Sequence, residues 1–173
     1  MGVVDRNRRR KIQREAEGYL ELGLPRHALA ALGRLGDPTS FDAHCLYLWG
    51  ESLRALQRYE EALLPLEQAA QADPDNIHVW VALGWCYKRT GQLDMAIEAM
   101  EAALIAQPEE ALLHYNLSCY LSLAGKKERS LEHLRIALEI EPGYRRLIDE
   151  EPDFDPLRGD PDFQALCQGQ RVV

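Results

Sequence analysis

Apolar and small residues follow a helical spacing through residues 77–110. In the first half of this stretch they recur at steps of three and four, so they share one helical face. Gly91 then breaks the pattern where the chain has to turn, and Pro108 ends a second helical stretch. The pattern predicts two helices joined by a short turn. The first stripe is Trp80, Leu83, Gly84 and Tyr87, and the second is Ala96, Met100 and Ala103.

The same pattern returns when the sequence is shifted by 34 residues in either direction. Six columns of similar residues at one period indicate an internal repeat. A single helix pair this small leaves much of its apolar surface uncovered, so the copies are expected to stack on one another. The columns are Gly50, Gly84 and Ser118; Leu53, Tyr87 and Leu121; Ala62, Ala96 and Ser130; Leu66, Met100 and Leu134; Ala69, Ala103 and Ala137; and Pro74, Pro108 and Pro142.

These residues resemble the tetratricopeptide repeat family. Its W-x2-L-G-x2-Y, A-x3-F and closing P pattern appears in residues 80–108, with Met100 where the family usually has an aromatic residue. The resemblance covers about three quarters of the chain. It implies an all-α fold, a right-handed α-solenoid of antiparallel helix pairs with C-terminal capping helices. It also implies a groove that is presented to a protein partner.

The period divides the chain into six segments. A degenerate first repeat is expected because Glu15 replaces an apolar residue and Pro38 comes two residues early. Pro65 should kink the second helix of the next repeat. The segments are a basic N-terminal arm (1–11), the degenerate repeat (12–42), three full repeats (43–76, 77–110 and 111–144) and a C-terminal capping segment (145–173).

The two ends of the chain carry opposite charges. Five basic residues lie between Arg6 and Lys11, and they could contact an acidic surface or form a frayed, solvated end. At the other end, seven acidic residues lie between Asp149 and Asp162. Three prolines there prevent a long helix, and apolar residues such as Phe154 and Phe163 are expected to cover the last repeat. The wording FDPLRGDPDFQAL resembles the closing segment of bacterial proteins of this family, which implies a bacterial origin.

Composition narrows the functional class. The 173 residues have a net charge of -8, which argues against general affinity for nucleic acid. No apolar stretch approaches the roughly 18 residues that a membrane span requires. The basic N-terminus lacks the apolar core of a secretory signal, so the expected compartment is the cytoplasm.

Catalytic and metal-binding motifs are not found in the sequence. It has no glycine-rich phosphate loop, no His-Glu-x-x-His pair and no Gly-x-Ser-x-Gly elbow. His44 and His78 lie one repeat apart, but two imidazoles without a third ligand make a weak metal site. We therefore expect no enzyme activity, no cofactor and no metal. The four cysteines are interpreted as reduced thiols; they are Cys45, Cys86, Cys119 and Cys167.

A partner-binding groove is the candidate site. In the family, one face of each first helix lines the concave surface, and Trp85 points away from the stripe that holds its own helix pair together. Aromatic and cationic side chains at such positions are typical of protein-binding hot spots, and cations favour a ligand that carries carboxylates. The predicted groove residues are His44, Tyr47, Arg54, His78, Val81, Trp85, Lys88, Arg89, Leu112, Tyr115 and Cys119.

Three functions are compatible with this pattern. The leading hypothesis is a non-catalytic adaptor or scaffold that binds an extended or helical peptide with apolar and acidic groups. One alternative is a bacterial secretion chaperone that holds a cargo protein. The other is a self-assembling scaffold in which the basic start of one chain meets the acidic end of another. The sequence leaves the partner and the oligomeric state open.

Overall fold

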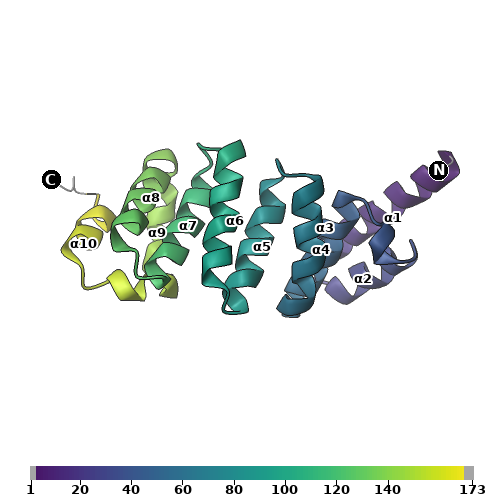
Figure 1. Ribbon diagram of the computed structural model, residues 1–173, viewed down its shortest axis with the longest axis horizontal. Helices are drawn as coiled ribbons and strands as arrows, with labels where there is room; N and C mark the ends of the chain where they lie inside the picture. The colour runs from purple at the N-terminus through teal and green to yellow at the C-terminus, as the bar shows by residue number, and fades with distance from the viewer. Residues whose placement is uncertain (1–2, 170–173) are drawn as a thin grey trace. The chain divides into compact units, whose positions relative to one another are not determined.

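The structure is a computed structural model that describes residues 3–169 (Figure 1). Helices and short turns account for the secondary structure of these residues, as the repeat pattern predicts. The chain forms two compact units, one ending at Thr90 and the other beginning at Gly91. Among the described residues, no helix is long and apolar enough to cross a membrane.

The first unit is built from consecutive helix pairs. Its α-helices pack in chain order, and α3 also contacts α1 and α5 directly. The elements are α1 (Val3–Glu21), α2 (Pro25–Gly33), the 3-10 turn η1 (Pro38–Ser40), α3 (Ala43–Ala55), α4 (Tyr59–Ala72) and α5 (Ile77–Arg89).

Two features of this unit bear on the sequence predictions. Helix α1 begins at Val3, so the residues from there to Lys11 are its first turns instead of an arm that precedes it. Pro65 lies inside α4, which runs without interruption from Tyr59 to Ala72. The side chain of Pro65 is buried, so its ring fills part of the core between the helices.

The second unit contains the last full helix pair and the C-terminal segment. Helix α7 packs against α6 and α8, and η3 packs against α7. The elements are α6 (Leu93–Ala106), α7 (Ala111–Leu123), α8 (Lys127–Ile140), η2 (Pro142–Tyr144), α9 (Arg145–Ile148), η3 (Pro152–Leu157) and α10 (Pro161–Cys167).

The C-terminal segment is a cap of short helices, as the sequence predicts. Asp160 starts α10 by accepting hydrogen bonds from the backbone N–H groups of Asp162 and Phe163. The Arg158 guanidinium donates to the carbonyl oxygens of Ile148, Asp149 and Glu151 at 3.0–3.2 Å. The apolar residues of the cap are buried except Leu147, which is 51 % exposed; the buried ones are Ile148, Phe154, Leu157, Phe163 and Leu166.

Candidate functional site

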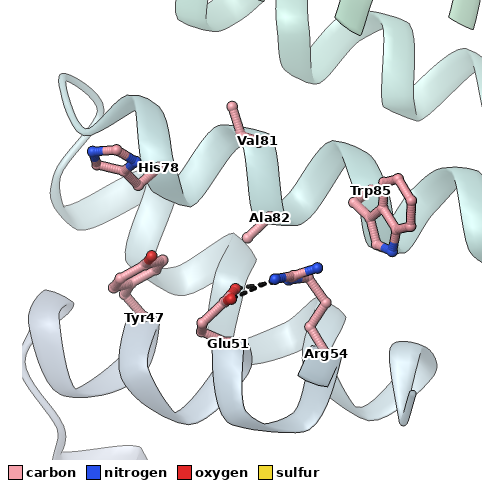
Figure 2. Close-up of a pocket in the computed structure, with 7 residues that line it drawn as sticks. All are labelled: Tyr47, Glu51, Arg54, His78, Val81, Ala82 and Trp85. Carbon is pink, nitrogen blue, oxygen red and sulfur yellow. Dashed lines mark hydrogen bonds and ion pairs between the residues drawn. The ribbon is translucent and has the colours of Figure 1, made fainter. Parts of the chain in front are cut away.

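Helices α3 and α5 form a pocket within the first unit. The N-cap side chains of Asp42 and Asn76 begin these helices by accepting backbone N–H bonds. Residues at steps of three and four then line the surface that the two helices share. The cavity has a volume of about 230 Å³. Its lining, the α3/α5 pocket hereafter, is Tyr47, Glu51, Arg54, His78, Val81, Ala82 and Trp85 (Figure 2).

Trp85 is the largest apolar side chain of this pocket. It remains 38 % exposed, although most large apolar residues of the protein are buried. The Lys88 ammonium lies 4.8 Å from the centre of the indole ring, within cation–π range. Trp85 therefore presents an aromatic surface to solvent with a cation beside it.

A two-bond ion pair links Glu51 and Arg54. The Arg54 Nε donates to Glu51 Oε2 at 2.8 Å, and Nη2 donates to Oε1 at 2.5 Å. These bonds raise the pKa of Arg54 above its ordinary value, with burial acting in the opposite sense. We expected Arg54 to supply positive charge to the groove, but Glu51 balances that charge, since the two residues lie three apart on one helix.

Tyr47 and His78 lie at the other end of the pocket, as Figure 2 shows. Tyr47 is half-buried, and burial, followed by the charge of Glu51, raises the pKa of its phenol. His44 lies beside the pocket, because its ring centre is 6.5 Å from that of Tyr47. The His44 Nε2 is 2.5 Å from Glu17 Oε1, so this imidazole already has a partner.

Arg89 is directed to a different surface. Its guanidinium carbon lies 5.2 Å from the ring centre of Tyr59, the first residue of α4. Arg89 does not line the α3/α5 pocket. Its place four residues after Trp85 led us to group the two side chains, but its guanidinium reaches the start of the neighbouring helix.

The predicted groove residues of the second unit are mostly buried. Leu112 is half-buried, but Tyr115 and Cys119 are only 5 % and 3 % exposed. The Tyr115 ring contacts Tyr144 at 5.0 Å and Phe154 at 5.8 Å between centroids. The prediction that Tyr115 and Cys119 line an open groove is therefore wrong, because the cap packs onto α7. The burial raises the pKa of the Tyr115 phenol.

Two pocket residues were not among the predicted site residues. Glu51 lies three positions before Arg54, and this spacing is the signal that would have indicated the ion pair. Ala82 follows His78 by one helical turn and has 5 % exposure. Its small side chain gives no sequence signal of binding, but it leaves room for the cavity.

The described residues contain no group of three potential ligands that could hold a metal ion. The cysteines in this region are also poor nucleophiles. Burial raises the pKa of Cys45 to about 11 and that of Cys86 to about 12, so both remain protonated thiols near neutral pH.

Sequence comparison bears on the repeat pattern. Residues 53–117 match the family model described as tetratricopeptide repeat. This part of the chain therefore carries the tetratricopeptide repeat, as the sequence pattern implied. The uncharacterized protein y4yS of Sinorhizobium fredii is 34 % identical over 79 residues, 46 % of this chain and 43 % of that protein. A chloroplastic protein of Arabidopsis thaliana is 29 % identical over 121 residues, 67 % of this chain and 34 % of that protein. The chain spans less than half the length of these relatives.

Solved structures share the fold. MamA 41-end from Desulfovibrio magneticus RS-1 has a TM-score of 0.71 at 21 % identity, over 97 % of this chain and 96 % of that chain. YrrB, described as a TPR protein with an unusual peptide-binding site, has a TM-score of 0.69 at 22 % identity, over 78 % of this chain and 70 % of that chain. The similarity confirms the predicted all-α class of helix pairs with C-terminal capping helices. A fold of this family supports a protein-interaction scaffold.

Proposed function

We propose that the protein is a non-catalytic cytoplasmic adaptor that binds a peptide segment of a partner protein at the α3/α5 pocket. The observation that carries the proposal is Trp85, a large aromatic side chain left exposed beside a cavity. Partly exposed aromatic residues next to a concave surface are common anchors of protein binding. The peptide-binding site named for the structurally similar YrrB supports the same class of ligand.

The pocket favours a peptide with an apolar anchor. Val81, Ala82 and the Trp85 indole supply apolar walls, and the cavity of about 230 Å³ accommodates a large side chain. The Glu51 carboxylate accepts one hydrogen bond at each oxygen from Arg54. Each oxygen keeps a second lone pair that can accept a peptide N–H.

A preference for acidic groups next to the anchor depends on Lys88. Its ammonium lies over the indole ring, so a carboxylate that flanks a side chain stacked on Trp85 would lie close to it. Arg54 contributes less because its charge is balanced by Glu51. The proposed ligand is therefore an apolar residue with an acidic neighbour, in an extended or helical segment.

Peptide display followed by calorimetry tests the proposal. Peptides selected from a random library on the whole chain should share an apolar anchor. The Trp85→Ala variant should bind them more weakly by about 2 kcal/mol or more, the size of an interface hot spot. Leu64→Ala is the matched control, because Leu64 is 62 % exposed on α4 and outside the pocket. Equal affinity of the two variants, with unchanged circular dichroism, would rule out the pocket.

A further inference from the structure

A basic stripe runs along α1. Arg6, Arg10 and Arg14 are spaced four residues apart, so they lie on one side of the helix, and all three are exposed. Arg14 Nε donates a hydrogen bond to the Arg10 carbonyl oxygen. Among the described residues, no carboxylate forms an ion pair with these three side chains. Like charges at this spacing repel one another within a helix. An opposite charge placed along the stripe would relieve that repulsion.

The stripe lies partly on a projecting length of helix. Helix α1 has 19 residues and α2 has 9, so α2 covers only about half of α1 at roughly 1.5 Å per residue. The end of α2 is marked by the hydrogen bond from Arg8 Nη2 to the Arg34 carbonyl oxygen. The first turns of α1 extend beyond α2 in Figure 1. This length of α1 is open to a second helix.

A groove of the opposite charge lies on the second unit, between α8 and α10. Its volume is about 240 Å³, and Leu131 and Leu166 supply an apolar floor. Acidic side chains form the rim, and we call the site the acidic groove. Its lining is Glu128, Leu131, Glu132, Arg135, Asp162 and Leu166.

Two acids of the rim remain without a cation among the described residues. Glu128 and Glu132 are exposed, and neither forms an ion pair within the part of the chain that the structure describes. Asp162 shares Lys127 with Asp160, at 3.6 and 2.5 Å, and this contact fixes the start of α10 against α8. The Arg135 guanidinium pairs with Glu139 at 2.8 Å. The rim thus presents negative charge above an apolar floor.

We propose that the basic stripe of α1 docks into the acidic groove of a second copy of this chain. Arg6 and Arg10 are four residues apart, as are Glu128 and Glu132, so both pairs repeat at about 6 Å along their helix axes. Two helices side by side can therefore match two cations with two anions. The aliphatic stems of the arginines would cover Leu131 and Leu166 while their guanidinium groups reach the rim.

The contact joins different surfaces of two copies, so it is heterologous and leaves one stripe and one groove unused in each pair. Further copies add head to tail. The net charge of -8 opposes association, but it is spread over the whole chain, whereas the cations of the stripe and the anions of the groove would be in direct contact. The local complementarity of stripe and groove then decides the association. This assembly is independent of the α3/α5 pocket.

Sedimentation velocity of the whole chain at low salt tests the assembly. The wild-type mass should exceed that of one chain, rise with concentration and fall as salt is added. Arg6→Glu with Arg10→Glu should give monomers, as should Glu128→Arg with Glu132→Arg. Mixing the two variants should restore the oligomers, because each reversed surface then meets its complement. Circular dichroism checks that each variant is folded.

Two control variants distinguish this interface from an effect of net charge or of the α3/α5 pocket. Arg26→Glu with Arg146→Glu makes the same change in net charge as Arg6→Glu with Arg10→Glu, on exposed residues outside the stripe and groove, and should leave the oligomers intact. Trp85→Ala should also leave them intact, because peptide binding uses a different surface. A monomeric wild type at low salt would overturn the proposal, even if the stripe bound anionic vesicles or polyglutamate. Failure of the mixed variants to associate would overturn it too.

Discussion

Gly50 and Leu66 are in such close contact that no side chain fits between their helices. A Cβ atom on Gly50 would lie 2.5 Å from Leu66 Cγ and 2.7 Å from Cδ2, and Leu66 is completely buried. At the equivalent place in the second unit, the hydroxyl of Ser130 donates to the Ser118 carbonyl oxygen at 2.8 Å. Gly50 and Ser118 of this column thus lie between paired helices, as the repeat pattern predicted.

Gly50→Ala should therefore destabilise the protein although alanine favours helices. Overpacking of a closed core costs about 1–3 kcal/mol, which exceeds the gain of about 1 kcal/mol in helix propensity. Gly18→Ala in α1 is the matched control, because a Cβ there meets nothing within 4 Å. We expect urea unfolding to show a loss of stability for Gly50→Ala and a gain for Gly18→Ala. Stabilisation by both substitutions would show that α3 and α4 can move apart at little cost.

Glu51→Gln should tighten the binding of acidic peptides. The substitution removes the carboxylate that balances Arg54, so the α3/α5 pocket gains one positive charge. The expected gain is about two- to fivefold in affinity, or about 0.4–1 kcal/mol, the range of an exposed ion pair. Calorimetry with one peptide from the selection, in its acidic and neutral forms, measures the difference.

Glu61→Gln is the control for this change. Arg58, the residue that precedes α4, forms the same type of pair with Glu61 of α4, at the same spacing and outside the pocket. The control makes the same change in net charge, so it should alter affinity little. An equal gain from both substitutions would mean that net charge, instead of the charge at the pocket, governs binding.

His133, which lies against His114, should make stability depend on pH. Their Nδ1 atoms are 2.8 Å apart, and His114 Nε2 is 2.8 Å from the Pro108 carbonyl oxygen. That oxygen only accepts, so His114 carries its proton on Nε2, and His133 Nδ1 donates to the neutral His114 ring. Both rings cannot carry a full set of protons in this geometry.

The direction of the pH effect follows from the His133 pKa. Burial is the largest effect and lowers the pKa of His133 below 6.5, and His114 and Arg129 also lower it. Glu132 and Glu101 act to raise it. Below about pH 6.5 the unfolded chain therefore binds more protons at His133 than the folded chain does. The free energy of unfolding decreases as the pH is lowered towards the pKa that His133 has in the folded protein. Urea unfolding at about pH 7.5 and about pH 5.5 should show this loss. It should be smaller in His133→Gln; an equal loss would assign it to other groups.

The repeat period was enough to predict the helices and their packing. The columns of small residues define which faces meet, because any side chain at Gly50 would collide with Leu66. The apolar residues of the C-terminal segment likewise indicated a cap. These predictions depend on residue spacing within one or two neighbouring helices, and this spacing can be read from the sequence.

The exposure and the pairing of individual side chains were harder to predict. Tyr115 occupies the same column as Tyr47, but η3 and its Phe154 cover it, whereas Tyr47 lines a pocket. Whether Glu51 balances the charge of Arg54 depends on the rotamers that bring the two side chains together. The cover over Tyr115 comes from a segment that does not follow the repeat, so the repeat period does not predict it.

The Arg158 side chain cross-links the C-terminal segment that covers α7. The Arg158 guanidinium bonds three carbonyl oxygens through Nη2, and its Nε bonds Asp155. Lysine carries one compact ammonium and lacks this planar, forked geometry. The exposure of α7 to water therefore depends on Arg158, which lies about forty residues further along the chain and outside the repeats.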